Sequence, residues 1–367
     1  MCIRDSKKIY LCAVAALALA SCSNDETVEV AKQSAISFRS VVGLNTRAVE
    51  TITGNLDAIN VTAYKGTEAY FGVADPIKYE KNGNFFESAQ KYYWPVDDAE
   101  LTFIALSTNW TGTRAFTSSS DIKMTDVTID KNVKNQADMI YVSGATGKKS
   151  VNEASGLGLV MDHALSQIQI NAKNGNDLYK YRVKGIRIAN VNKKATFDVI
   201  DGTWNNASEV ETYDVNYDTP ITLQADAQPL MEKNVTNNNL YENAMLIPQT
   251  TTAWDGTAID DAVTGSYISV YLQITTKDGG LVYPKKTDGF AWASVPVSFT
   301  WVRGRKYIYT LDFTNGAGKV DPVDPGTDWK KDEPQKDPDK GQDILGEPIK
   351  FTVTVNPWTP EDKNQEM

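Results

Sequence analysis

Side chains that could carry out chemistry are few in this chain of 367 residues. His163 is the single histidine, which excludes any zinc site that needs two histidine ligands. A Ser–His–Asp arrangement could form only through His163, and no G-x-S-x-G or comparable nucleophile motif accompanies it. We therefore interpret His163, at the start of an expected strand, as a structural residue.

Two other segments share only part of the pattern of a ligand-binding loop. "GATGKKS" (144–150) has its glycines too close together for a phosphate loop, and Lys149 stands where Ser or Thr should follow the lysine. "DPDKGQDILGE" (337–347) alternates acids, but its glycine and last glutamate are misplaced for an EF-hand. No spacing selects a pair of glycosidase carboxylates. The sequence predicts no catalytic residue, no metal site and no cofactor, so we expect no enzyme; a hydrolase built on the second half is the weakest alternative.

The cysteines predict one covalent modification. Cys2, Cys12 and Cys22 are the only cysteines. Two lysines, an apolar run at 9–20 that is too short to span a bilayer, and the tetrapeptide LASC indicate a lipoprotein signal peptide over residues 1–21. We expect lipid on Cys22 and membrane attachment through it. An ordinary secretory signal is the alternative, and in either case the mature chain has no internal disulfide.

The charge balance narrows the choice of partners. The formal net charge is −10, which argues against nucleic acid and against anionic lipid head groups. Hydrophobic residues make up 41% of the chain, enough for a substantial core.

Short alternating apolar runs recur along the mature chain, separated by Gly, Asn and Asp. "INVTAY", "SQIQINA", "YISVYLQITT" and "KYIYTLDF" are examples, and no long stretch has a helical apolar period. This pattern predicts an all-β protein with two consecutive β-sandwich domains. The Asn- and Gly-rich segment 171–181 suggests the boundary, which gives domains over 48–173 and 174–318.

The two ends of the chain are expected to lie outside these domains. Residues 22–47 form a pro-segment with the first strand. Residues 319–341 hold four prolines, seven acids and five lysines, and we expect an acidic linker that gives reach to the strand segment 342–367.

The first and last strands carry the same alternation of apolar residues. Because alternate residues face one side of a strand, each strand presents one inward face. The faces consist of Ile36, Phe38, Ser40 and Val42 in the first strand and of Ile349, Phe351, Val353 and Val355 in the last.

Several phrases together resemble the fimbrillin family, the pilins and anchors of fimbriae on Bacteroides-type bacteria. They are "KYYWPVDDAELTFIAL", "QADMIYVSG", "MDHALSQIQI", "NAMLIPQT", "WVRGRKYIYTLDF" and "TVNPWT". The acids after Cys22 are likewise similar to the export signal of surface lipoproteins in such bacteria. The resemblance covers most of the mature chain.

The resemblance implies two transthyretin-like β-sandwiches and an assembly route. An arginine-specific protease removes the first strand, and a strand from another subunit fills the groove. In this chain the expected cut lies between Arg47 and Ala48, in a loop that a protease can reach; Arg39 is a poorer site because it lies in a probable strand. The matching faces predict that Phe351 and its companions replace Ile36, Phe38 and Val42 of a neighbour. The alternative is that the last strand completes its own sandwich.

These observations predict a structural subunit of fimbriae at the outer membrane and cell surface that supports adhesion. Its partners would be other fimbrial subunits, in a homo- or hetero-polymer, and an arginine-specific protease. The alternative from another class is a surface glycan-binding lipoprotein that uses some of its eight tryptophans.

Overall fold

The computed structural model describes residues 34–42, 56–231, 243–285, 289–323 and 339–357. Within these residues the secondary structure is almost entirely β-strand, and the described residues from Ala35 onward form one compact unit. The helical elements of this part are the short α1 (Lys149–Asn152), η1 (Val133–Asn135) and η2 (Asp260–Ala262). The all-β class expected from the alternating runs is confirmed.

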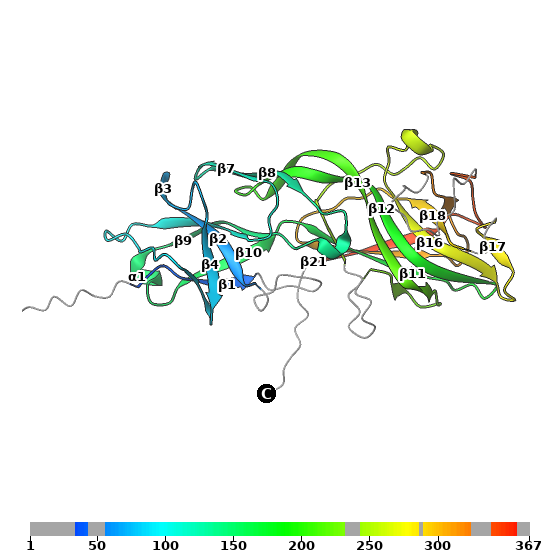
Figure 1. Ribbon diagram of the computed structural model, residues 1–367, viewed down its shortest axis with the longest axis horizontal. Helices are drawn as coiled ribbons and strands as arrows, with labels where there is room; N and C mark the ends of the chain where they lie inside the picture. The colour runs from blue at the N-terminus through cyan, green and yellow to red at the C-terminus, as the bar shows by residue number, and fades with distance from the viewer. Residues whose placement is uncertain (1–33, 43–55, 232–242, 286–288, 324–338, 358–367) are drawn as a thin grey trace, which may run out of the picture. The chain divides into compact units, whose positions relative to one another are not determined.

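The first sheet is built from the N-terminal half of the chain. Its strands are β1 (Phe38–Val42), β2 (Ala58–Lys65), β3 (Glu68–Phe71), β4 (Ile77–Asn82), β5 (Phe85–Ser88), β6 (Leu101–Ser107), β9 (Ile140–Gly147) and β10 (Leu157–His163). Their order is β3-β2-β4-β5-β1-β10-β9-β6, and β6 pairs back onto β2, so the sheet closes on itself. Figure 1 shows β1 in blue beside β10.

Two further sheets contain the rest of the strands. The second sheet runs β14-β11-β19-β21, with β15 also on β11; these are β11 (Ser166–Lys173), β14 (Gln228–Pro229), β15 (Ala244–Leu246), β19 (Arg305–Asp312) and β21 (Lys350–Pro357). The third sheet runs β20-β18-β16-β12-β8-β7, with β13 on β12 and β17 on β16. Its strands are β7 (Thr113–Ser118), β8 (Asp121–Thr128), β12 (Tyr179–Asp198), β13 (Thr203–Thr222), β16 (Tyr267–Thr276), β17 (Leu281–Tyr283), β18 (Ala291–Pro296) and β20 (Lys319–Val320).

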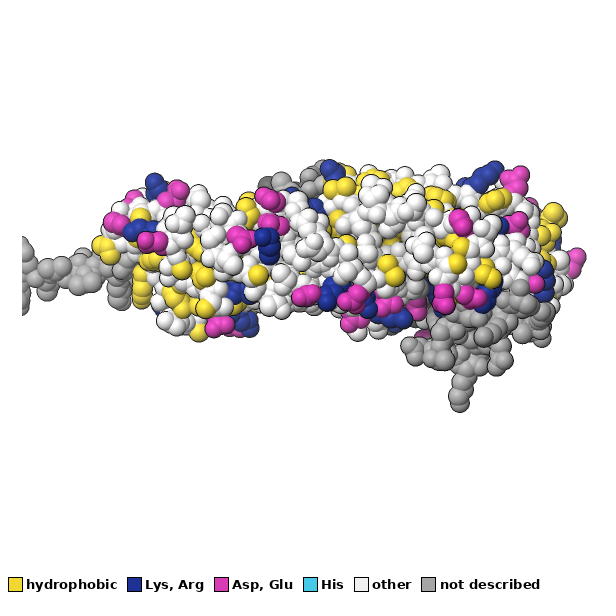
Figure 2. All heavy atoms as spheres, turned by 90° about the horizontal axis from the view of Figure 1, so that it is seen from above, with side chains coloured by type: hydrophobic (Ala, Val, Ile, Leu, Met, Phe, Trp, Pro, Cys, Tyr) yellow, Lys and Arg dark blue, Asp and Glu magenta, His cyan; other side chains and the backbone are white. Residues whose placement is uncertain are grey.

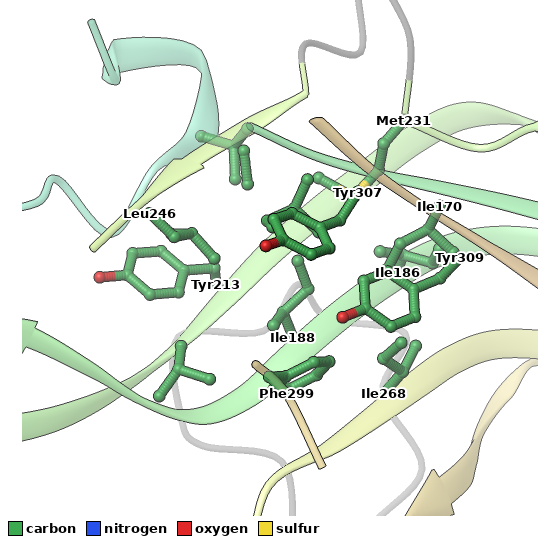
Figure 3. Close-up of a cluster of buried hydrophobic side chains, with 14 of the residues drawn as sticks. Ile170, Ile186, Ile188, Tyr213, Met231, Leu246, Ile268, Phe299, Tyr307 and Tyr309 are labelled. Carbon is green, nitrogen blue, oxygen red and sulfur yellow. The ribbon is translucent and has the colours of Figure 1, made fainter. Parts of the chain in front are cut away.

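The second and third sheets pack face to face around a common core. Figure 3 shows Ile170, Tyr307 and Tyr309 from the second sheet pointing toward Ile188 and Ile268 from the third. All five side chains are almost completely buried. Full burial of one such side chain contributes about 1.5–3 kcal/mol. Burial of the alternating apolar residues therefore stabilises this β-sandwich-type arrangement.

Strand partners change within the segment that was expected to close the first domain. β10 pairs with β9 and β1 in the first sheet, whereas β11 pairs with β15 and β19 in the second. The hairpin β7–β8 also joins the third sheet, through β12. The change of partner therefore falls between His163 and Ser166, ahead of the expected boundary at 173/174, and the division into two domains stays a prediction.

The surface mixes both signs of charge. On the face in Figure 2, Lys and Arg side chains lie beside Asp and Glu side chains. Many are paired across short distances, as in Lys65 with Asp97 at 2.8 Å and Lys194 with Asp126 at 3.0 Å. Such exposed pairs contribute about 0–1 kcal/mol each, so the core, rather than the charges, determines the stability.

Buried tyrosines give the fold a predictable response to alkaline pH. Burial raises the pKa of Tyr181 and of Tyr309 to about 12. In the unfolded chain both phenols ionise near 10, so the stability that they contribute is complete below about pH 10 and is lost as the pH rises toward 12. We expect urea unfolding to show a decline of about 1.4 kcal/mol per pH unit for each phenol in that range.

A Tyr181→Phe variant separates this effect from general alkaline damage. Its decline should be shallower by about 1.4 kcal/mol per pH unit, because one ionisation is absent. Absorbance at 295 nm follows the phenols directly; full ionisation of every tyrosine near pH 10 in the folded protein would contradict the expectation.

Candidate functional site

The first strand, β1, lies in the interior of the closed first sheet. It pairs in parallel with β10 from Phe38 opposite Leu157 to Val42 opposite Met161, and antiparallel with β5 at Phe38 opposite Phe86. Because β10 pairs with β1 along its whole length and β5 pairs with it at Phe38, the loss of β1 would leave an open slot between β5 and β10. The sequence predicted the strand but not the strands that flank it.

The side chains of β1 and its lead-in fill an apolar pocket. Ile36 and Phe38 are 1% and 0% exposed. The Phe38 ring centroid lies 4.8 Å from that of Tyr79 and 5.1 Å from that of Phe103, both edge-on. Burial also raises the pKa of the Tyr79 phenol. The inward face predicted from Ile36 and Phe38 is thus confirmed; the side chains of Ser40 and Val42 lie outside what the structure describes.

The last strand, β21, lies at the open edge of the second sheet. It pairs antiparallel with β19 along its whole length, from Lys350 opposite Asp312 to Pro357 opposite Arg305. Its apolar side chains remain partly in solvent: Phe351 is 37% exposed, Val353 41% and Val355 51%. β21 therefore holds to its own sheet through its backbone, while its apolar face is incompletely covered.

The apolar face of β21 points to the same side as the core of the sandwich. Val353 lies opposite Tyr309 and Phe351 opposite Leu311, and residues directly opposite in a ladder share one face of the sheet. Tyr309 is buried, and its hydroxyl accepts a hydrogen bond from Trp301 Nε1 at 2.9 Å. The fully buried core of the sandwich thus ends at β19, and β21 lies beyond the edge of that core.

Ile349 differs from the three apolar residues that follow it. It is 4% exposed and belongs to the core cluster of the sandwich. The face predicted for the last strand is therefore divided: Ile349 is packed into its own chain, and Phe351, Val353 and Val355 are not.

The acidic run does not act as an extended tether in this structure. Val320 N–H donates to Gln342 O at 2.9 Å, and Gly341 N–H donates to Val320 O at 3.0 Å. The two ends of the expected linker 319–341 are thus hydrogen-bonded to each other, and its first residues form β20 on β18. Because these two described ends are bonded to each other, the run adds no reach to β21 in this conformation.

The residues predicted for lipidation and proteolysis, Cys22, Arg47 and Ala48, lie outside the described residues. Arg39, the poorer cleavage candidate, is in β1 opposite Gly158. No helix of the described part is long and apolar enough to cross a membrane.

His163 occupies a buried polar pair. Its Nδ1 lies 2.7 Å from Asp138 Oδ2, and both side chains are almost fully buried. Asp138 precedes His163 by 25 residues, a separation with no signal in the sequence. Among the residues that the structure describes, no group of three or more His, Cys, Asp or Glu side chains could hold a metal ion.

The tryptophans provide no exposed platform among the described residues. Trp94, Trp254, Trp292 and Trp301 are buried. Trp110 and Trp204 are partly buried, stack on each other at 6.2 Å and donate to backbone carbonyls. Trp329 and Trp358 lie outside the described ranges. The glycan-binding alternative was based on exposed tryptophans, and the described part of the chain offers no such platform.

Comparison with known proteins identifies the family. A fimbrillin-like family model matches residues 46–358. A fimbrial protein from Bacteroides vulgatus is 17% identical in sequence and superposes with a TM-score of 0.54, covering 89% of this chain and 100% of its own. A fimbrilin from Porphyromonas gingivalis is 13% identical with a TM-score of 0.42, covering 89% and 98%.

No curated protein matches the chain. The structural likeness to the Bacteroides vulgatus protein supports the fold, and the family match spans most of the length, including both sheets of the sandwich and β21. The resemblance to fimbrillins is thereby confirmed: the chain belongs to the fimbrillin-like family.

Proposed function

We propose that this chain is a structural subunit of cell-surface fimbriae that polymerises by strand exchange and supports adhesion. The family match supports the fimbrial role. The observation that carries the assembly route is the contrast between the ends of the chain. Near the N-terminus, β1 is an interior strand, and Ile36 and Phe38 are buried there. Near the C-terminus, β21 is an edge strand whose apolar face is partly exposed.

The proposed route begins with export as a lipoprotein held by Cys22. Proteolysis between Arg47 and Ala48 then removes the lipid and β1 together, because both precede the cut. This releases the subunit from the membrane and opens the slot between β5 and β10. Burial of Ile36 and Phe38 contributes about 1.5–3 kcal/mol each, so the empty slot strongly favours a replacement strand.

The proposed replacement is β21 of a neighbouring subunit. Its backbone groups would pair with the slot, and Phe351, Val353 and Val355 would enter pockets that water otherwise fills. Each subunit then donates one strand and accepts another. Such a heterologous contact continues into an open polymer of like subunits or of related ones.

Strand exchange predicts that charge on one face of β21 blocks assembly and charge on the other does not. We compare Phe351→Asp/Val353→Asp with Thr352→Asp/Thr354→Asp, which places the same two charges on the opposite face. An unpaired buried carboxylate costs about 3 kcal/mol or more, so the first variant should form at least about 100-fold less polymer.

The assay uses protein from Ser23 onward, an arginine-specific protease and a gel run without boiling. Wild type and the Thr352/Thr354 variant should form ladders. A chain that ends at Ile349 should be cut cleanly and stay monomeric. Equal ladders from both charge variants would rule out Phe351 and Val353 as exchanged side chains.

The cleavage site makes a second prediction. Arg47→Ala should prevent the cut and the ladder, because the protease requires arginine before the scissile bond. Arg39→Ala is the matched control and should be cut as wild type is, since Arg39 lies within the paired strand β1. Intact-mass spectrometry reports the new N-terminus, which should be Ala48; a product that starts at Ser40 would contradict the proposed site.

Lipidation makes a third prediction. Cys22→Ala in the full-length precursor, expressed in a Bacteroides host, should shift the protein from the detergent phase to the aqueous phase of Triton X-114. Acyl chains contribute about 0.8 kcal/mol per buried CH₂ group, and this variant carries none. Cys12→Ala, within the apolar run of the signal, should partition as wild type does; loss of partitioning in both variants would indicate a general export defect instead.

A further inference from the structure

We infer that Ile349 is the pivot of the proposed strand exchange. Residues 342–349, called the anchor segment below, stay bound to their own subunit, and only β21 passes to the neighbour. The inference rests on the proposed function and names the residue that positions the exchanging strand. It follows from an abrupt change in burial and bonding between Ile349 and Lys350.

Backbone hydrogen bonds hold the anchor segment against residues 315–320. Ile344 N–H donates to Gly318 O at 2.9 Å, and Glu347 N–H donates to Asn315 O at 3.0 Å. In the opposite direction, Ala317 N–H donates to Leu345 O at 2.9 Å. The two segments therefore form a short ladder immediately ahead of β21.

Close packing reinforces this ladder at two glycines. A Cβ atom at Gly316 would lie 1.5 Å from Glu347 O, so the two backbones approach more closely than any side chain would allow. A Cβ at Gly318 would lie 2.5 Å from Ser294 O and 2.8 Å from Ile349 Cδ1. Gly318 also has a φ of +73°, which favours glycine. Ile349 thus packs directly against the backbone of its own subunit at Gly318.

The chain beyond Ile349 has a different attachment. Every residue of β21 is exposed, and β21 contacts the sheet through the ladder with β19. Detaching β21 exposes the covered parts of Phe351, Val353 and Val355, which are already 37–51% in solvent. Detaching the anchor segment would in addition expose the buried Ile349 and the partly buried Ile344 and Leu345. Local opening begins where buried contacts are fewest. Detachment of β21 alone, up to the boundary between Ile349 and Lys350, therefore costs less free energy than detachment that includes the anchor segment.

Two engineered disulfides test where the moving part begins. Protein from Ser23 onward has no native cysteine. Thr310→Cys/Thr352→Cys joins β19 to β21, and Lys319→Cys/Asp343→Cys joins the anchor segment to β20; both are pairs of antiparallel partners. Such partners lie about 4.5–5.5 Å apart, within the range for a disulfide.

The pivot predicts opposite results for these two variants after arginine-specific proteolysis. When oxidised, the Thr310/Thr352 variant should form no ladder, and reduction should restore it. The Lys319/Asp343 variant should form the wild-type ladder in both redox states. A ladder that the Lys319/Asp343 disulfide blocks and reduction restores would overturn the pivot, because the anchor segment would then have to move.

Hydrogen exchange on uncleaved protein gives a readout that does not depend on polymerisation. The amides of Ile344 and Glu347 should exchange at least about tenfold more slowly than those of β21. Equal protection of the two segments would overturn the pivot even if ladders form. If wild type forms no ladder while the protection differs as expected, strand exchange fails and the anchored arrangement of the monomer stands.

Discussion

An interior strand cannot leave a closed sheet unless something replaces it. β1 is hydrogen-bonded on both sides, by β5 and β10, and the ring of Phe38 fills the space between Tyr79 and Phe103. Its loss leaves unpaired backbone groups on two strands and an apolar pocket open to water, each of which is costly. The rest of the proposed assembly depends on this constraint, because it makes the cleaved subunit a strong acceptor for an alternating strand.

Two edge strands of the sandwich, β13 and β21, differ in charge and in backbone regularity. β13, a long strand that pairs with β12, carries Glu209 and Glu211, which form ion pairs with Lys193 at 3.7 and 3.4 Å. Glu209 also has a φ of +53°, which disturbs the regular edge. Charges and irregular backbone are the usual means by which an edge strand avoids pairing with another chain.

β21 lacks these protective features over most of its length. It has one charged residue, Lys350, at its beginning, and an uninterrupted Phe-Thr-Val-Thr-Val run follows. Such a strand is suited to pairing and would be a hazard in a protein that must stay monomeric. In the monomer the ladder with β19 occupies one edge of β21. The difference between β13 and β21 is therefore consistent with one edge that is closed to partners and one that is kept available.

Local periodicity made the all-β class and the inward face of the first strand predictable. Ile36 and Phe38 alternate with polar residues, and burial follows that alternation directly. Strand partners were not predictable, because pairing depends on the path of the whole chain. β11 follows β10 directly in the sequence but pairs with β19, far along the chain. The division of the last strand was hidden for the same reason: Ile349 and Phe351 look equivalent in sequence, and only the ladder with 315–320 separates them.

The acidic run shows that composition alone does not determine how far a segment can reach. Proline and charge predicted a segment without regular structure, and reach was inferred from its length. Reach, however, depends on where the ends are held, and Val320 and Gly341 are bonded to each other. The entropy of closing a loop grows only logarithmically with its length, by about 0.6 kcal/mol per doubling, so an insertion between these two positions costs the fold little. The distance that the last strand can cover is then set by the residues that follow Ile349, whatever the length of the run before it.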